Sequence, residues 1–257
     1  KTSKIISSLK KSRLNATSKG KQIICTIPAY RFDIFGPMDL VEETALGYGI
    51  NNLEPALSPS QTLGQTNPVS SELKSLSQIM IGIGYLEALN SSLTSKRVLY
   101  EMTNRNTEKI ISVLDSKSQE HTILRDSILP GLLENLSKNI HESYPQKMFE
   151  TGTVFTLDNP ISEKINFSCI SAHQDTNFSE IKSVLQSALK TGFDILIETK
   201  TATHPSFEEG RCAKVMLNGK PIGIIGEINS KIIENYKIRI PVVGFEISLS
   251  ESILKSF

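Results

Sequence analysis

The chain has 257 residues, of which 39% are hydrophobic and 21% are charged, and its net charge is +1 at pH 7. These values are typical of a soluble globular protein that is long enough for two domains. No apolar run approaches the ~20 residues of a membrane span, and the basic N-terminus lacks a signal-peptide core, so we expect a cytoplasmic protein without a membrane partner.

Charge is distributed unevenly along the sequence. Residues 1–32 hold eight Lys and Arg and no acid, which leaves 20 basic and 27 acidic side chains in the remainder. A basic arm attracts phosphate, so one interpretation is an RNA-facing surface, and the other is a solvated helix at a domain edge. Since the first residue is Lys rather than Met, we expect a fragment of a longer protein.

The three cysteines predict neither a disulfide framework nor a zinc site. Cys25, Cys169 and Cys212 are far apart, and no cysteine or histidine pair has zinc-ligand spacing. We therefore expect buried thiols in a reducing compartment, and none of the four scattered histidines is assigned a catalytic role.

The N-terminal elements predict a small winged-helix-like domain over residues 1–57. A short amphipathic helix is expected within 3–14, and the β-branched stretch 21–28 predicts a strand. A second helix is expected over 38–49, ended by glycine.

Residues 58–70 are rich in proline and small polar residues, which predicts a linker to a second domain over 71–257. That domain mixes helices and strands without regular alternation, so we expect an α+β fold on a mostly antiparallel sheet. The predicted elements are helices within 71–89, 128–140 and 178–193, strands 87–95, 110–115, 146–157 and 242–249, and a hairpin over 213–228 turning at Asn218-Gly219.

Four carboxylates gather in "RFDIFGPMDLVEE", namely Asp33, Asp39, Glu42 and Glu43. If the helix begins near Met38–Asp39, its three acids share one face. The opposite face then holds the apolar side of the helix, which is formed by Leu40, Val41, Thr44, Ala45 and Tyr48.

Three interpretations of this cluster are open from the residues alone. Asp39 and Glu42 match a capping box with Asp39 as the N-cap. Arg31 is a candidate ion-pair partner for one of the acids. The four carboxylates also match the oxygen ligands that magnesium prefers.

The same segment resembles the beta subunit of the phenylalanyl-tRNA synthetase family. The matching residues are Pro28, Arg31, Asp33, the run 39–43 and the ending at 48–52. The resemblance continues through "GYLEALNSSLTS", "LRDSILPGLLENLSKN", "MFETGTVF" and "HPSFEEGRCAKVMLNGKPIGIIGEINSKI", so it covers essentially the whole chain.

The resemblance implies a winged-helix-like domain followed by a core shaped like a class II aminoacyl-tRNA synthetase catalytic domain. It implies an alpha subunit as partner in an α2β2 heterotetramer, with tRNA as the other partner. It also implies a magnesium site formed by Asp33, Asp39, Glu42 and Glu43 and completed by the alpha subunit. The editing domain of this family would lie upstream of Lys1.

A class II core needs two arginines to hold the phosphates of ATP, because guanidinium binds phosphate bidentately and stays charged. At the first position this chain has Met148, and at the second Ile247 follows the run Gly244-Phe245-Glu246. The resemblance therefore implies a ligase subunit that is inactive alone, with ATP bound only by the alpha subunit and with structural roles for Glu150 and Glu246. The alternative is a free-standing winged-helix protein that binds nucleic acid.

Overall fold

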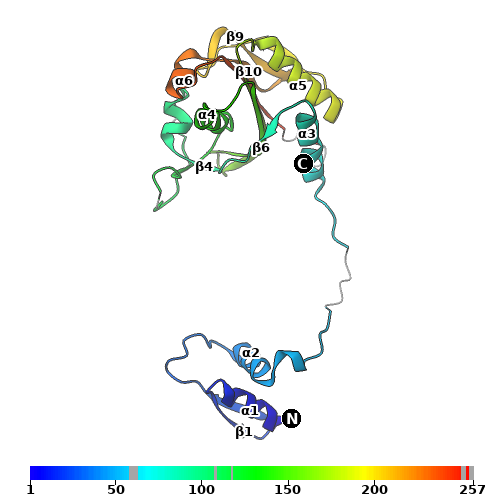
Figure 1. Ribbon diagram of the computed structural model, residues 1–257, viewed down its shortest axis with the longest axis vertical. Coiled ribbons are helices and arrows are strands. Elements are labelled where there is room, and N and C mark those ends of the chain that lie inside the picture. The colour runs from blue at the N-terminus through cyan, green and yellow to red at the C-terminus, as the bar shows by residue number, and fades with distance from the viewer. Residues whose placement is uncertain (58–62, 107–108, 117, 250–252, 255–257) are drawn as a thin grey trace. The chain divides into compact units, whose positions relative to one another are not determined.

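The computed structural model describes residues 1–57, 63–106, 109–116, 118–249 and 253–254, and divides the chain into two compact units, Lys1–Gly64 and Gln65–Phe257 (Figure 1). Of the predicted linker, residues 58–62 lie outside the described ranges, and the first helix of unit 2 already begins at Pro68.

Unit 1 consists of two helices and a two-stranded hairpin around a small core. Its elements are α1 (Thr2–Lys11), β1 (Asn15–Lys19), β2 (Gln22–Thr26), α2 (Pro37–Tyr48) and the 3₁₀ turn η1 (Ile50–Asn52). The buried centre is Leu9, Leu14 and Ala16, against which Leu40 of α2 packs. Val41 and Tyr48 of the predicted apolar face are exposed, because the small core of unit 1 leaves much of α2 uncovered.

Helices α1 and α2 approach closely at Gly47. A Cβ atom at this position would lie 2.3 Å from the carbonyl oxygen of Ser8, which is backbone and cannot rotate away. The Lys11 ammonium donates to the carbonyl oxygen of Gly47 at 2.7 Å. The glycine is therefore required by the helix contact rather than by a turn.

Unit 2 is built on a seven-stranded sheet in the order β3-β6-β7-β11-β10-β9-β8. Neighbouring strands run antiparallel except for the parallel pair β3 and β6, which confirms an α+β fold on a mostly antiparallel sheet. The strands are β3 (Leu86–Glu87), β6 (Gln146–Thr156), β7 (Ser162–Ala172), β8 (Glu198–Thr201), β9 (Phe207–Leu217), β10 (Lys220–Ile228) and β11 (Val242–Ser248).

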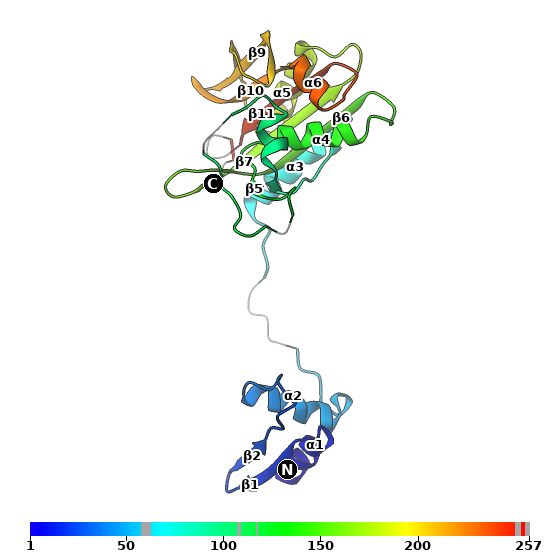
Figure 2. The ribbon, with the colours of Figure 1, turned by 90° about the vertical axis from the view of Figure 1, so that its left-hand side faces the viewer.

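Helices cover both faces of this sheet (Figures 1 and 2). Phe149, Phe167 and Phe245 belong to the core shared with α3 (Pro68–Gly82) and α5 (Phe178–Phe193). Met148 lies one residue from Phe149 and Val242 three residues from Phe245, and both belong to the core shared with α4 (Leu129–Lys138) and α6 (Ser230–Asn235). The alternation follows from the two-residue repeat of a strand.

Smaller elements connect these layers. The π-helix η2 (Arg97–Glu101) follows the short ribbon strand β4 (Leu93–Thr94), which pairs with β5 (Ile123–Leu124). The predicted strands 87–95 and 110–115 are therefore wrong in extent, since the second contributes only a bridge from Ser112 to Ile123.

The predicted hairpin turn is confirmed, with φ of 50° at Asn218 and 78° at Gly219 between β9 and β10. The three cysteines are free thiols, but Cys25 is only half-buried, because unit 1 has too little core to cover it. Across the described ranges, no helix combines the length and apolar character needed to cross a membrane.

Candidate metal site and sheet-face site

The four predicted metal ligands lie in unit 1, on α2 and the loop before it. Asp33 belongs to the loop after β2, whereas Asp39, Glu42 and Glu43 lie on α2. Asp33 and Glu42 are exposed, and Asp39 and Glu43 are half-buried. The acids are therefore near one another in sequence but have different surroundings.

Asp39 caps the helix, although not as the N-cap residue. The N-cap is Gly36, helix α2 begins at Pro37, and Asp39 is the third helical residue. One carboxylate oxygen, Oδ2, accepts from the backbone N–H groups of Phe35 at 2.7 Å and Gly36 at 2.8 Å. The predicted capping box was placed three residues too late, because proline at the first helical position fixes the start.

Arg31 forms the centre of the charge cluster. Its Nε and Nη2 donate to the two oxygens of Asp33 at 2.8 and 2.6 Å, and Nη2 also donates to Glu43 Oε1 at 2.5 Å. The hydrogen bond from Arg31 lowers the pKa of Asp33 to about 2. Hydrogen bonds from Ser12 and then Arg31 lower the pKa of Glu43.

In this arrangement the four acids are divided among different partners. Within the part of the chain that the structure describes, no group of three or more Asp, Glu, His or Cys side chains has metal-binding geometry. Asp33 and Glu43 bind the Arg31 guanidinium, and Asp39 binds the backbone. The donor set has magnesium chemistry, but a cationic side chain lies between two of its members.

In unit 2, neither expected phosphate-binding position exposes a polar group. Met148 is buried in the core beneath α4, and Ile247 is buried in the core on the opposite face of the sheet. The nearby Arg125 has its Nη1 atom 2.6 Å from Glu150 Oε1, and both side chains are buried. This guanidinium is therefore committed to a buried ion pair.

The two sheet carboxylates are held by structural hydrogen bonds, as the resemblance implied, and their partners come from strand β7, from loops and from a helix end. Glu150 accepts from Asn90 Nδ2 at 2.7 Å as well as from Arg125. Glu246 accepts from Asn166 Nδ2 at 2.6 Å and from Ser127 Oγ at 2.6 Å. Glu246 also accepts from the backbone N–H groups that begin α4, at Ile128 and Leu129.

Sequence reasoning missed a polar cluster beside Glu246. Arg105 Nη2 donates to Asp126 Oδ2 at 2.7 Å, and the Tyr100 hydroxyl donates to the same oxygen at 3.0 Å. Burial, and then the charge of Arg105, lower the pKa of His204, which favours a neutral imidazole. These residues are distant in sequence, so no motif spacing identifies them.

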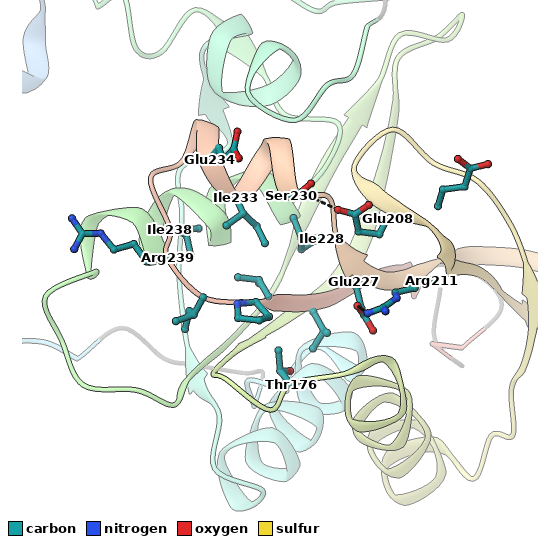
Figure 3. A pocket seen from close by; sticks show the side chains of 15 residues that line it. Thr176, Glu208, Arg211, Glu227, Ile228, Ser230, Ile233, Glu234, Ile238 and Arg239 are labelled. Carbon is teal, nitrogen blue, oxygen red and sulfur yellow. Dashed lines mark hydrogen bonds and ion pairs between the residues drawn. The ribbon is translucent and has the colours of Figure 1, made fainter.

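Unit 2 also has a concave region between α6, β9, β10 and the start of β11 (Figure 3). It has a volume of about 590 Å³ and an apolar floor that includes Ile228 and Ile238. Two of its acids are engaged, since Glu208 accepts from the Ser230 N–H at 2.7 Å and Glu227 pairs with Arg211 at 2.6 Å.

Comparisons with known proteins match both units to domain families of tRNA synthetases. Residues 1–50 match the profile described as "tRNA synthetase B5 domain", and residues 55–249 match "Phenylalanyl tRNA synthetase beta chain CLM domain". Phenylalanine–tRNA ligase beta subunits are 40% identical in Methanococcus maripaludis strain C7, 38% in Methanocaldococcus jannaschii and 36% in Archaeoglobus fulgidus, each over 95% of this chain.

The chain spans 44% to 46% of the length of these relatives. Among solved structures, a pyrrolysyl-tRNA synthetase from Desulfitobacterium hafniense matches with a TM-score of 0.58 and 14% identity, over 70% of this chain and 66% of that one. This match shows that the covered part of the chain shares its fold with that synthetase.

Proposed function

The chain belongs to the phenylalanyl-tRNA synthetase beta chain family, and from that premise we propose that it is a non-catalytic subunit portion of a cytoplasmic ligase that charges tRNA with phenylalanine. In this proposal an alpha subunit binds ATP and performs the chemistry. The beta chain organises the alpha subunit in an α2β2 assembly. The observation behind the assignment is the family match over 195 consecutive residues, 55–249.

The interior of unit 2 supports a non-catalytic role. The two positions that hold phosphate-binding arginines in a class II core are occupied by the buried apolar side chains of Met148 and Ile247. Arg125 neutralises Glu150 inside the protein. Neither position therefore offers a cation to a phosphate group.

Exposed apolar side chains support an interface with a partner subunit. In unit 2, Leu86 of the edge strand β3 and Leu89 just after it are 72% and 91% exposed, beside Ile81 and Ile83 at the end of α3. Clustered exposed apolar residues at one edge are typical of protein interfaces. We assign this surface, named here the α3–β3 edge, to the alpha subunit.

Magnesium binding by Asp33, Asp39, Glu42 and Glu43 stays a prediction, and it requires a rearrangement of the acid cluster. Arg31 must release Asp33 and Glu43 before the four carboxylates can share one cation. In this proposal, contact with the alpha subunit causes that release. Phe32 and Phe35 beside the acids are largely exposed, so a partner subunit can pack against them and move the loop that holds Arg31.

Unit 1 supplies the tRNA-facing surface in this proposal. Its order of helix, hairpin and helix is compatible with a winged-helix-like domain. Seven of the eight basic residues in 1–32 are exposed, and the eighth, Arg31, is paired with acids. The exposed ones are Lys1, Lys4, Lys10, Lys11, Arg13, Lys19 and Lys21.

Mixing this chain with the alpha subunit tests the proposal. We expect co-elution at micromolar concentration in size-exclusion chromatography, weaker association when magnesium is chelated, and no pyrophosphate exchange by this chain alone. The double variant Leu86→Ser and Leu89→Ser removes the apolar edge, so its association should be weaker by about tenfold or more.

Leu196→Ser is the matched control, because Leu196 is equally exposed but lies before β8, at the other end of the sheet. Separate elution of the unmodified chain and the alpha subunit would contradict the proposed function. Tight, salt-sensitive binding of unrelated RNA without any alpha association would favour the free-standing nucleic-acid-binding alternative.

A further inference from the structure

A cation that belongs to the chain itself lies within the acid cluster of unit 1, which is formed by Asp33, Asp39, Glu42 and Glu43. Arg31 holds the Asp33 carboxylate through two nitrogens, with Nε 2.8 Å from Oδ1 and Nη2 2.6 Å from Oδ2. A guanidinium that binds a carboxylate through two parallel hydrogen bonds forms one of the stronger ion pairs in proteins.

The guanidinium lies between two carboxylates that come from different elements. Its Nη2 donates to Asp33 in the loop after β2 and also to Glu43 on α2. A divalent cation that bridged the same two oxygen atoms would need the same position. The two cations therefore exclude each other, since like charges at such a short separation repel strongly.

The contact between Arg31 and Glu43 is the covered half of this arrangement. The side chains of Arg31 and Glu43 are 19% and 16% exposed, whereas that of Asp33 is 62% exposed. Ser12, which follows α1, donates a further hydrogen bond to Glu43. Because partly buried charges are screened less than exposed ones, added salt or free metal displaces this pair less readily than a surface pair.

The other two acids cannot replace the pair as a metal site. Asp39 uses Oδ2 to accept the backbone N–H groups of Phe35 and Gly36, and Glu42 is exposed on the surface of α2. Magnesium loses its hydration water reluctantly and demands a near-ideal set of oxygen ligands. Asp33 and Glu43 are therefore needed for tight binding, and Arg31 occupies both.

We propose that Arg31 keeps the acid cluster of the isolated chain closed to divalent cations, because it serves as the counter-ion of Asp33 and Glu43. The inference rests on the proposed function, since it describes how magnesium binding there is regulated. Affinity for the metal is low in the free chain and rises when the loop that carries Arg31 moves. By linkage, magnesium and the alpha subunit then promote each other's binding.

Removal of the guanidinium tests this regulation on the full chain without the alpha subunit. Calorimetry measures the binding of Mg²⁺, and paramagnetic broadening of NMR signals by Mn²⁺ locates the site. We expect no saturable binding to the unmodified chain below millimolar metal. In Arg31→Gln, Asp33 and Glu43 are like charges without a cation, so Mg²⁺ should bind at least about tenfold tighter, with broadening centred on both acids.

Two further variants separate this effect from net charge. Arg13→Gln removes an exposed arginine of the same unit and should bind metal like the unmodified chain. The double variant Arg31→Gln and Glu43→Gln should lose the affinity gained by Arg31→Gln, because one carboxylate of the site is missing. If Arg31→Gln fails to fold, Arg31→Lys keeps the charge without the two-nitrogen grip and should show a smaller gain.

Saturable Mg²⁺ binding by the unmodified chain at micromolar concentration overturns the proposal. Equal affinity of the folded Arg31 variant and the unmodified chain, or an equal gain in Arg13→Gln, overturns it too. Since these titrations omit the alpha subunit, their outcome is distinct from that of the co-elution experiment. A chain that co-elutes with the alpha subunit but fails the titrations keeps its proposed function and loses only this regulation.

Discussion

At the scale of single residues, the acid cluster of unit 1 is organised by one arginine. In the sequence, Arg31 lies two residues before Asp33 and twelve residues before Glu43 of α2. An ion pair between Arg31 and one of the acids was one of the three interpretations that the sequence allowed. What the pattern alone could not give is the choice of partners, because this depends on how the loop of residues 27–36 folds back over α2. The structure gives Arg31 both Asp33 and Glu43.

Replacing Arg31 should change the acid titration of unit 1. The folded pKa of Asp33, about 2, is below its ordinary value of about 3.9, so the pair stabilises the fold above that ordinary value. The contribution is lost as the pH falls through about 2. In Arg31→Gln we expect the pKa of Asp33 to rise toward the ordinary value, measured by NMR of the side-chain carboxyl.

Arg13→Gln is the control for this titration, because Arg13 is an exposed arginine of the same unit. The pKa of Asp33 should be unchanged in that variant. An equally low pKa in Arg31→Gln would show that Arg31 is not the cause.

At the scale of elements, predictions succeeded where local chemistry dictates structure. The Asn218-Gly219 turn requires positive φ at both positions, and few other sequences satisfy this, so the hairpin was readable. Strand β1 was missed because "NATSK" has one buried side chain and no alternation of apolar residues. The strand forms because it pairs with β2 and packs against α1, and these tertiary contacts cannot be inferred from the local sequence.

The contact between α1 and α2 also escapes the sequence pattern, because a glycine near a helix end is ordinarily interpreted as a terminator. Gly47→Ala should destabilise unit 1 by about 1–3 kcal/mol, since its Cβ would collide with the Ser8 carbonyl and force the helices apart. A denaturant unfolding curve, monitored through the NMR signals of unit 1, measures this change in the free energy of unfolding.

Gly64→Ala provides the comparison, because no atom lies within 4 Å of a Cβ built there and its φ is not positive. We expect its unfolding curve to match that of the unmodified chain. Identical curves for Gly47→Ala and Gly64→Ala would mean that the helices have room to separate.

At the scale of the whole molecule, the α+β class was predictable, but the strand order was not. Strand β11 pairs with β7 and β10, and these pairings join residues far apart in sequence that no local pattern specifies. The acids of the candidate metal site were likewise readable from the sequence. The Arg105–Asp126 pair was not, since two segments that are separate in the sequence bring it together.

The two units should differ in stability. Unit 2 has cores on both faces of its sheet, whereas unit 1 buries a single small cluster. Small cores bury less apolar surface and open more readily. In hydrogen exchange we expect the slowest amides in β7 and β11 and markedly faster exchange in α1, β1 and β2. Uniform protection over both units would contradict this ranking.

The burial of Met148 has a consequence for any attempt to place an arginine at this position. An arginine restored at this position would introduce a charge into a core of leucine and isoleucine beneath α4, beside a pair, Arg125 and Glu150, that is already neutral. Burying an unpaired charge costs several kcal/mol. An arginine at position 148 would therefore destabilise unit 2 unless the core beneath α4 is repacked around it.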